Sequence, residues 1–537
     1  MNDPTSNPTA PAPTASTPKQ KLAMLPACAD PHEGIREHAS YDGPVSLRCD
    51  VVVVGSGPGG AVAAKELAEA GRDVILVEEG PAFGVKDFTL EPGEAMHRMF
   101  REGGSRAARG TPFLPTMQAI GLGGGSVMNS AICARPPDWV FEKWAETVGT
   151  HEVTRASLDP HFDRIEAMLG VAPTPMEVQG ERNLAFKRAC DKLGISSEPT
   201  WRNVQGCLGS GECFTGCRNG AKRSVDITYV PAAMRAGARV LTSVRVETVS
   251  ATGRKATGIR GHVVEPFTGK ASHPVEIHAD CVVMGAGCMA TPVILERSGL
   301  CGGNGYLGRE LEFHPGLAIM ALFEQPIDPW KGATQGYHSL EYLADGVKFE
   351  VLWSPPAVLA TRLPGLGRDF QKHLLRYDRM APFDVITATD HSRGTVRARR
   401  GSFEPDIRFK FDQRDMDKMQ YGLGILNDIC WAAGAYAILP GLNGIPETIE
   451  NQKDAEIIRT HKLRAEDTIT AANHAFCSTR MSRDPKLGVV DESGRCHEMD
   501  NLYIVDSGIF GGSSGVNPMF TIMALADRIA LGIAARW

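Results

Sequence analysis

The chain of 537 residues is 42% hydrophobic and 22% charged, with a formal net charge of −6. This composition is typical of a globular protein, and the length exceeds one ordinary core, so we expect two or more intertwined domains. The slightly acidic balance disfavours a nucleic-acid partner, which would require a basic surface.

Residues 1–25 are rich in Pro, Thr, Ala and Ser. Such a segment buries too little apolar surface to fold, so we expect a disordered tail. No stretch reaches the roughly 18 apolar residues of a transmembrane helix, and no basic region followed by an apolar one indicates a secretory signal. The 13 scattered cysteines therefore indicate reduced thiols and predict a cytoplasmic protein.

The first predicted unit is a strand, a glycine-rich turn, a helix and a second strand. Four consecutive valines at residues 51–54 predict a buried strand, and the turn Gly-Ser-Gly-Pro-Gly-Gly follows at residues 55–60. A helix over residues 61–70 and a strand over residues 73–77 complete the unit. This arrangement is typical of a dinucleotide site, with the pyrophosphate at the helix N-terminus. Glu78, at the end of the second strand, is suited to accept hydrogen bonds from ribose hydroxyls and disfavours the 2′-phosphate of NADP.

The middle of the chain mixes helical and extended patterns. A second glycine-rich turn at residues 121–126 indicates unusual backbone angles or a close contact. The predicted elements that follow are a helical region, a loop rich in cysteine and glycine, and three strands: residues 151–193, 206–220, 239–249, 258–264 and 281–284.

From residue 316 to residue 449 alternating strands dominate. In residues 407–411, Ile407, Phe409 and Phe411 share one face. The next helix carries apolar residues three or four apart: Met416, Met419, Leu423, Leu426 and Cys430. We interpret this stripe as core packing rather than a cofactor contact, and the region as a sheet with helices on one face.

With its later motifs the chain resembles the glucose–methanol–choline (GMC) FAD oxidoreductases, from about residue 49 to residue 537. The resemblance rests on residues 55–60 with Glu78 and on four more motifs: Gly121-Leu122-Gly123-Gly124-Gly125-Ser126-Val127-Met128-Asn129-Ser130, Gly285-Ala286-Gly287-x-x-x-Thr291-Pro292, His474-x-x-x-x-Thr479-Arg480-Met481, and residues 501–506 with Gly515-Val516-Asn517-Pro518. The loop containing Cys207, Cys213 and Cys217 is similar to that of the long-chain alcohol oxidase and cholesterol-oxidase-like branch.

The resemblance implies an α/β fold (α+β overall), in which a Rossmann-like FAD-binding domain is interleaved with a substrate domain on a mostly antiparallel sheet. We expect the FAD-binding domain to span residues 45–315, with inserted helical and cysteine-rich segments at about 150–225. The substrate-binding domain is expected over residues 316–465, and residues 466–537 return to the FAD-binding domain with the active-site residues.

The resemblance also implies the site residues. His474 matches the family's base, and histidine suits proton abstraction near neutral pH. Asn517 matches the partner that hydrogen-bonds the substrate oxygen near flavin N5. His314 and His497 lack such a motif, and we interpret them as structural or surface residues. The implied cofactor-binding residues are Gly55, Gly57, Pro58, Gly60, Glu78, Gly123, Gly124, Ser126, Asn129, Ser130, Val246, Asp506, Pro518 and Met519.

Asn517 and Pro518 are also good residues for starting a helix. We expect the last helix to begin at Asn517 and to run through Thr521, Ala524 and Ile529. Its N-terminal dipole would stabilise negative charge at the flavin N1–C2=O edge on reduction.

Three features qualify the resemblance. Met128 stands where choline-oxidase-like members have a histidine that bonds the flavin, so we expect noncovalent FAD. Cys477 replaces a usual glycine three residues after His474, which bears on pocket size. Some family members hold an iron–sulfur cluster in a loop such as that of Cys207, Cys213 and Cys217, but we favour ordinary loop cysteines and expect no metal.

The predicted function is FAD-dependent oxidation of an alcohol to an aldehyde or ketone by hydride transfer to flavin N5. The branch resemblance implies an apolar or aromatic alcohol, with oxygen, a quinone or a cytochrome as electron acceptor. Two alternatives remain open. One is a non-redox or photochemical relative, such as a hydroxynitrile lyase or a fatty-acid decarboxylase. The other is a dehydrogenase subunit that passes electrons to a cytochrome or quinone partner.

Overall fold

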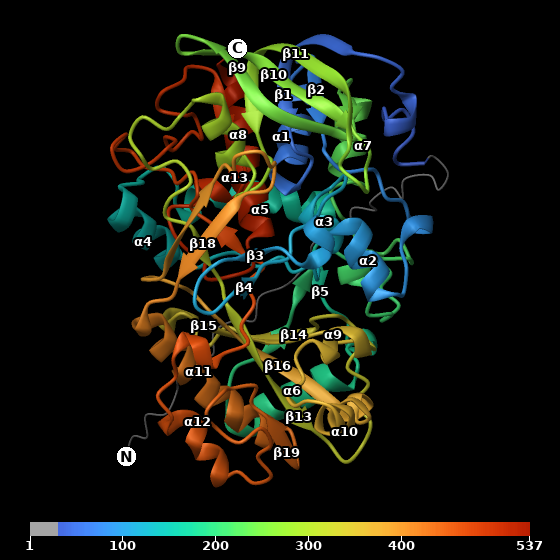
Figure 1. Ribbon diagram of the computed structural model, residues 1–537, viewed down its shortest axis with the longest axis vertical. Coiled ribbons are helices and arrows are strands. Elements are labelled where there is room, and N and C mark those ends of the chain that lie inside the picture. The colour runs from blue at the N-terminus through green and yellow to red at the C-terminus, as the bar shows by residue number, and fades with distance from the viewer. Residues whose placement is uncertain (1–29, 537) are drawn as a thin grey trace, which may run out of the picture.

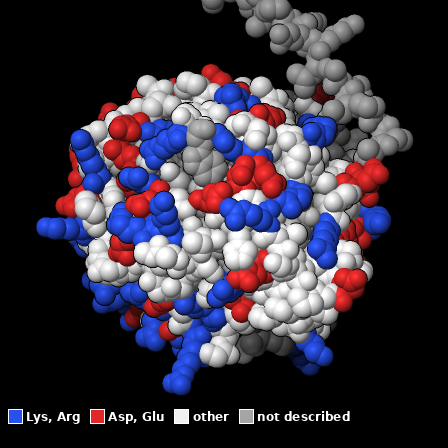
Figure 2. Space-filling view, turned by 90° about the horizontal axis from the view of Figure 1, so that it is seen from above, with Lys and Arg blue, Asp and Glu red and all other residues white. Residues whose placement is uncertain are grey.

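The computed structural model describes residues 30–536, which form two sheet-based regions stacked along the long axis (Figure 1). The tail predicted over residues 1–25 lies outside the described residues. Within the described part, no helix combines the length and apolarity needed to cross a membrane. On the face seen in Figure 2, acidic and basic side chains are interspersed.

The first region is built on a seven-stranded sheet. In order across the sheet its strands are β8 (Arg239–Leu241), β2 (Val74–Val77), β1 (Val45–Val54), β11 (Ala271–Met284), β10 (Lys255–Val264) and β9 (Val244–Thr252), with β21 (Leu502–Ile504) also beside β11. The strands from β8 to β11, and β21, are parallel, whereas β10 and β9 are antiparallel. The four valines predicted as a buried strand form the end of β1 and are fully buried, as a strand covered on both faces requires.

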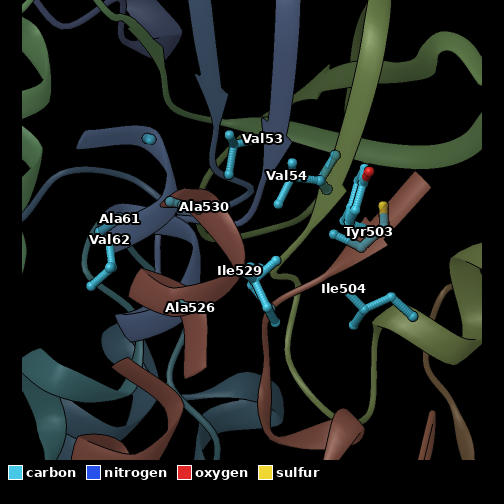
Figure 3. Close-up of a cluster of buried hydrophobic side chains, with 14 of the residues drawn as sticks. Val53, Val54, Ala61, Val62, Tyr503, Ile504, Ala526, Ile529 and Ala530 are labelled. Carbon is cyan, nitrogen blue, oxygen red and sulfur yellow. The ribbon is translucent and has the colours of Figure 1, made fainter. Parts of the chain in front are cut away.

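Helices α1 (Pro58–Glu69) and α13 (Met519–Ala535) pack against each other beside this sheet. Figure 3 shows side chains from both chain ends in one core: Val53, Val54, Ala61 and Val62 from the start, and Tyr503, Ile504, Ala526, Ile529 and Ala530 from the finish. The last helix therefore completes the core that the first strand begins.

The strand predicted over residues 239–249 is wrong as a single element. Ser243 has a φ of +59°, a left-handed conformation that interrupts the extended chain. Residues before it form β8, next to β2, and residues after it form β9, at the other end of the strand order. A serine with positive φ has no distinctive sequence signal, which is why the pattern reads as continuous.

The second region is a six-stranded sheet in which every neighbouring pair is antiparallel, as predicted. Its strands are β19 (Ala437–Leu439), β13 (Gly316–Leu322), β16 (Met380–Thr387), β15 (Val347–Val351), β14 (Tyr337–Ser339) and β6 (Glu198–Pro199). Helix α11 (Gln413–Ala432) packs on one face together with α6 (Glu181–Leu193) and α12 (Ile457–Thr460). The predicted apolar stripe of α11 is buried in this core, so its interpretation as packing is confirmed.

Two segments lie elsewhere than expected. Residues 407–411 do not join the six-stranded sheet: β18 (Asp406–Lys410) pairs with β17 (Arg393–Arg397) in a separate two-stranded sheet. The helical stretch 151–193 is two helices, α5 (Arg155–Leu169) and α6, and Gly170 ends the first with a φ of +62°. Since α5 contacts α13 while α6 contacts α11, this insertion serves both regions.

Short elements connect the two regions. The remaining helices are α2 (Pro92–Met99), α3 (Gly125–Met128), α4 (Asp138–Val148), α7 (Tyr229–Arg235), α8 (Thr291–Ser298), α9 (Pro356–Ala360) and α10 (Arg368–Leu374). Three two-stranded pairs complete the list: β3 (Ala107–Ala108) with β4 (Leu114–Pro115), β5 (Ala172–Pro173) with β7 (Trp201–Arg202), and β12 (Glu312–Phe313) with β20 (Ala475–Phe476).

Candidate active site

A cavity of about 430 Å³ lies between the two regions and reaches from the turn after β1 to the polar face of the six-stranded sheet. At the first end, Gly55 has a φ of +92°, and an added Cβ would lie 2.4 Å from the Gly285 carbonyl oxygen. The next residues, Gly57, Pro58 and Gly59, line the cavity at the N-terminus of α1. Their place brings the positive end of the helix dipole to the cavity wall, as a pyrophosphate requires.

Glu78 lies in the same wall, just after β2, and is 7% exposed. Its carboxylate accepts hydrogen bonds from Ser56 N (3.0 Å), Ser56 Oγ (2.6 Å) and Gly80 N (2.9 Å). Burial raises the pKa of this carboxyl, and the three hydrogen bonds oppose that shift. Oε1 receives one of these bonds, which leaves it capacity to accept another from a ligand hydroxyl.

Ser56 also ties the first glycine-rich turn to the second, because Gly123 N donates to its Oγ at 3.0 Å. Ser126 Oγ donates to Gly123 O and accepts from Val225 N, so its hydrogen bonds hold the turn rather than face the cavity. Gly60, Gly123 and Ser126 lie behind the wall, and we infer that they support the site rather than contact a ligand. The other predicted cofactor residues line the cavity: Gly55, Gly57, Pro58, Glu78, Gly124, Asn129, Ser130, Val246, Asp506, Pro518 and Met519.

Asp506 joins the C-terminal segment to this wall, two residues beyond the end of β21. Its carboxylate accepts from Thr291 Oγ1 (2.5 Å), Gly508 N (2.9 Å) and Gly287 N (3.0 Å). Burial raises the pKa of the carboxyl, while these bonds oppose the shift. Asp506 thus fixes the glycine turn after β11 against the last strand.

His474 and Asn517 line the opposite end of the cavity. His474 Nδ1 lies 3.3 Å from Nδ1 of His314, whose Nε2 lies 2.5 Å from Ser513 Oγ. Burial lowers the pKa of His474 to about 4, and the nearby Glu350 and Lys348 act in opposite directions on it. Burial also lowers the pKa of His314 well below its usual value, so both rings are neutral at pH 7.

His314 is buried and lines the cavity, where it contacts His474 directly. No motif around His314 predicts this contact, since the residue stands alone before β13. His497 is different: its Nε2 lies 3.0 Å from the Ser482 carbonyl oxygen, away from the cavity lining.

Asn517 does not cap the last helix, contrary to expectation. Helix α13 begins at Met519, and the side-chain Oδ1 of Asn517 instead accepts a hydrogen bond from Lys348 Nζ. The same ammonium pairs with Glu350, which also accepts from Gln335 Nε2 at 2.5 Å. Lys348 and Glu350 are 2% and 1% exposed, so the polar face of β15 is sealed inside the protein.

This polar face is the part of the site that sequence reasoning missed. Along β15, Val347, Phe349 and Val351 enter the core under α11. Glu350 lines the cavity from the opposite face of the strand, where Lys348 reaches Asn517. Such an alternation of apolar and charged residues is typical of a strand with one face in water. Burial alone would raise the pKa of Glu350, but the paired ammonium of Lys348 lowers it overall.

The residues that qualified the resemblance have clear positions. Met128 lines the cavity. Cys477 is fully buried with a φ of +69°, a conformation that glycine adopts most readily, and it lies outside the cavity lining. Cys207 and Cys213 both accept from the Arg202 guanidinium, at 3.6 and 3.9 Å. Residues 30–536 contain no group of three or more His, Cys, Asp or Glu side chains placed to hold a metal ion.

The cavity fits a flavin dinucleotide in three respects. A helix N-terminus, an acidic strand end and glycine-rich turns lie at one end, and a neutral histidine with an amide lies at the other. An added Cβ on Gly57 would meet nothing within 4 Å, so this glycine leaves open space at the helix N-terminus. An added Cβ on Gly124 would come within 2.9 Å of Gly57 Cα, so the two turns approach as closely as glycine allows.

Comparisons with known proteins agree with this geometry. Two family profiles described as GMC oxidoreductase match residues 96–316 and 390–526, and one described as FAD binding domain matches residues 50–89. An uncharacterised GMC-type oxidoreductase of Mycobacterium tuberculosis is 32% identical over 94% of this chain and 80% of its own length. A long-chain-alcohol oxidase of Arabidopsis thaliana is 27% identical, over 91% of this chain and 68% of its own. The crystal structure of pyridoxine 4-oxidase from Mesorbium loti has the same fold, with a TM-score of 0.69 at 18% identity, covering 90% of this chain and 99% of that one.

Proposed function

The chain belongs to the GMC oxidoreductase family and uses FAD, and on that basis we propose that it oxidises an alcohol to an aldehyde or ketone. The observation that carries the proposal is a neutral, half-buried histidine, His474, in the cavity that the amide of Asn517 also lines. Oxidation of an alcohol removes one proton from oxygen and two electrons with the carbon-bound hydrogen. Bound FAD supplies the acceptor for the hydride equivalent.

His474 is the proposed base. A base needs a lone pair, and a histidine whose pKa lies near 4 keeps one throughout the neutral range. Its Nδ1 faces His314, while Nε2 has no hydrogen-bond partner among the described residues. We assign Nε2 as the atom that takes the hydroxyl proton.

His314 is a positioning residue for this base. For Nε2 of His474 to be free, its Nδ1 must carry the hydrogen and donate to His314 Nδ1. His314 then carries its own hydrogen on Nε2 and donates to Ser513 Oγ, at 2.5 Å. Gly515 N donates to the same oxygen at 3.1 Å, which is compatible with Ser513 acting as acceptor.

Lys348 fixes the orientation of the Asn517 amide. An ammonium only donates, so the amide atom that it contacts is the acceptor Oδ1, and Nδ2 is the donor that remains. In the proposed reaction Nδ2 hydrogen-bonds the substrate oxygen and orients the carbinol carbon. A donor placed there stabilises the negative charge that develops on this oxygen as its proton leaves.

The walls around these polar groups favour a largely apolar substrate frame. Phe214, Leu352, Trp353, Val358 and Ile386 line this part of the cavity. Their side chains gain by covering apolar or aromatic carbon atoms, which supports an apolar or aromatic alcohol. An electron acceptor (oxygen, a quinone or a cytochrome) then completes the cycle.

Anaerobic stopped-flow absorbance tests the proposal. Holoenzyme mixed with aliphatic, benzylic and steroid alcohols should lose its oxidised-flavin absorbance with at least one of them. The His474→Ala variant should reduce at least a thousandfold more slowly with the same compound. The proposal fails if no alcohol bleaches the flavin, or if His474→Ala bleaches as fast as the wild type. If an alcohol reduces the flavin but oxygen does not reoxidise it, the protein is a dehydrogenase that needs a quinone or cytochrome.

A further inference from the structure

Asp384, a second carboxyl group beside that of Glu350, lines the active-site cavity. Asp384 is in β16, directly across from Glu350 in β15, and side chains at such cross-strand positions have their Cβ atoms about 5 Å apart. The neighbours of Asp384 in β16, Phe383 and Val385, point into the core under α11. Asp384 therefore shares the cavity-facing side of the sheet with Glu350, and both line the cavity.

Unlike Glu350, Asp384 has no partner in the described part of the chain. Its side chain is only 5% exposed, and neither oxygen has a hydrogen bond or ion pair with any of residues 30–536. Glu350, by contrast, is bonded to both Lys348 and Gln335. Buried polar groups in proteins are nearly always hydrogen-bonded, because burial without a partner forfeits the hydrogen bonds that water would make. An unpaired carboxyl that faces a cavity is thus free to hydrogen-bond a ligand.

Two neighbours keep this carboxyl open to the cavity. Gly316 faces Asp384 from the next strand, and a Cβ there would come within 2.9 Å of Oδ2. The absence of a side chain at Gly316 leaves that oxygen accessible from the cavity, which Gly316 also lines. Arg362 lines the same cavity but forms no ion pair with Asp384. Asp384 and Arg362 therefore line the same cavity without forming an ion pair with each other.

We propose that Asp384 recognises a second hydroxyl group on the substrate, so that the alcohol oxidised here is a diol on an apolar or aromatic frame. This inference rests on the proposed function, because it places the reacting hydroxyl at His474 and Asn517. The second hydroxyl, farther along the substrate, then donates to Asp384 on the neighbouring strand.

The charges around Asp384 favour a neutral hydroxyl over a cationic group. Lys348 is already neutralised by Glu350, and Arg362 brings a further positive charge to the cavity. Burial raises the pKa of Asp384 to about 7, while Arg362 opposes and Glu350 adds to the shift. A carboxyl of that pKa is able to bond a hydroxyl either as carboxylate or as acid, whereas an ammonium would need the carboxylate and would face the positive charge of Arg362.

Matched pairs of alcohols test the inference on the holoenzyme. 1,6-Hexanediol and 1-heptanol have equal numbers of non-hydrogen atoms, as do 1,4-benzenedimethanol and 4-ethylbenzyl alcohol. Anaerobic flavin reduction gives the diol-to-monool ratio of rate constants for each pair, and perturbation of the flavin spectrum gives the ratio of Kd values. The ratios are compared between wild type, Asp384→Leu, Asp384→Asn and the control Asp328→Asn. Asp328 is paired with Lys331 and lies outside the cavity lining.

In wild type and Asp328→Asn we expect at least one diol to be preferred tenfold or more over its matched monool. Asp384→Leu should abolish the preference by slowing the diol and sparing the monool, and Asp384→Asn should retain part of it. An unchanged ratio in Asp384→Leu would overturn the inference, and would mean that ordered water alone satisfies the carboxyl. A preference for 6-amino-1-hexanol that Asp384→Leu removes would overturn it in favour of an ammonium ligand.

The outcomes also separate this inference from the proposed function. If monools and diols reduce the flavin equally well, alcohol oxidation stands and the role of Asp384 falls. If no alcohol reduces the flavin, alcohol oxidation falls, and the Kd ratios of the same compounds still decide whether Asp384 binds a hydroxyl.

Discussion

His314 Nδ1 and His474 Nδ1 lie 3.3 Å apart, with the two rings nearly perpendicular at 83°. Because both rings are neutral, one nitrogen must donate and the other accept. The tautomer of one histidine is therefore coupled to that of the other, and in the proposed mechanism Ser513 sets the direction by accepting from Nε2 of His314.

Replacing His314 tests this coupling. His314→Phe removes the acceptor for His474 Nδ1–H, so we expect the rate of flavin reduction to fall about a hundredfold with a small change in KM. His314→Gln, whose Oε1 is an acceptor, should recover part of the rate. The control is His497→Gln, which lies outside the cavity. If Phe and Gln at position 314 give the same rate and the same pH profile, His314 serves only for packing.

The pH dependence follows from the pKa of His474. Since burial lowers that pKa to about 4, the base keeps its lone pair down to about pH 5 and loses it as the pH falls further. We expect kcat/KM to stay level between pH 8 and pH 5 and then to fall with one proton. Steady-state rates with a single alcohol measure this profile. A midpoint near 6.5, the ordinary pKa of histidine, would show that the substrate-free holoenzyme does not hold His474 in this desolvated state.

Lys348 and Glu350 should be coupled in stability. Lys348→Met leaves a buried carboxylate without its cation, which typically costs about 3–5 kcal/mol in free energy of unfolding. Glu350→Gln in the same chain removes that uncompensated charge, so the double variant should be more stable than Lys348→Met alone. Urea denaturation of the single and double variants measures the coupling. Additive losses would show that the two side chains act independently.

Gly57 and Gly59 are two residues apart but should respond differently to alanine. A Cβ on Gly59 would lie 1.9 Å from the Val505 carbonyl oxygen, so Gly59→Ala should prevent α1 from packing and lower the stability of the apoprotein. A Cβ on Gly57 enters the cavity and meets no protein atom. Gly57→Ala should thus leave the apoprotein Tm unchanged and reduce the FAD content of the purified protein. Equal Tm losses in both variants would contradict this distinction.

The flavin should not be bonded to the chain at residue 128. Met128, in the cavity wall, has no nucleophilic nitrogen. Acid precipitation of the holoenzyme should therefore leave all of the yellow colour in the supernatant. Colour retained in the washed pellet would show a covalent bond at some other residue.

The local part of the fold is predictable from the sequence, and the meeting of distant segments is not. Consecutive valines, glycine spacing and Glu78 suffice for the unit from β1 to β2, because each signal lies within thirty residues. The break at Ser243 escaped prediction because its positive φ depends on tertiary packing. His314 escaped because only folding brings it to His474.

The polar face of β15 escaped for a different reason. Lys348 and Glu350 alternate with Val347, Phe349 and Val351, a pattern shared by countless solvent-facing strands. What distinguishes this strand is that its charged side faces an internal cavity rather than water. Periodicity reports which residues share a face, but not what that face meets.

The contact of Gly59 with Val505 has a consequence for synthesis of the chain. During translation, the cavity wall at the N-terminus of α1 is complete only after β21 and α13 have emerged from the ribosome. The reason is that α13 packs on α1 and β21 pairs with β11 in the same core. Everything up to the end of α13 at residue 535 must therefore be made before the cofactor meets a complete binding site. We therefore expect FAD to bind only after α13 has been synthesised. A product truncated before α13 would contain the glycine-rich motif but would lack the fold that lets this motif bind FAD.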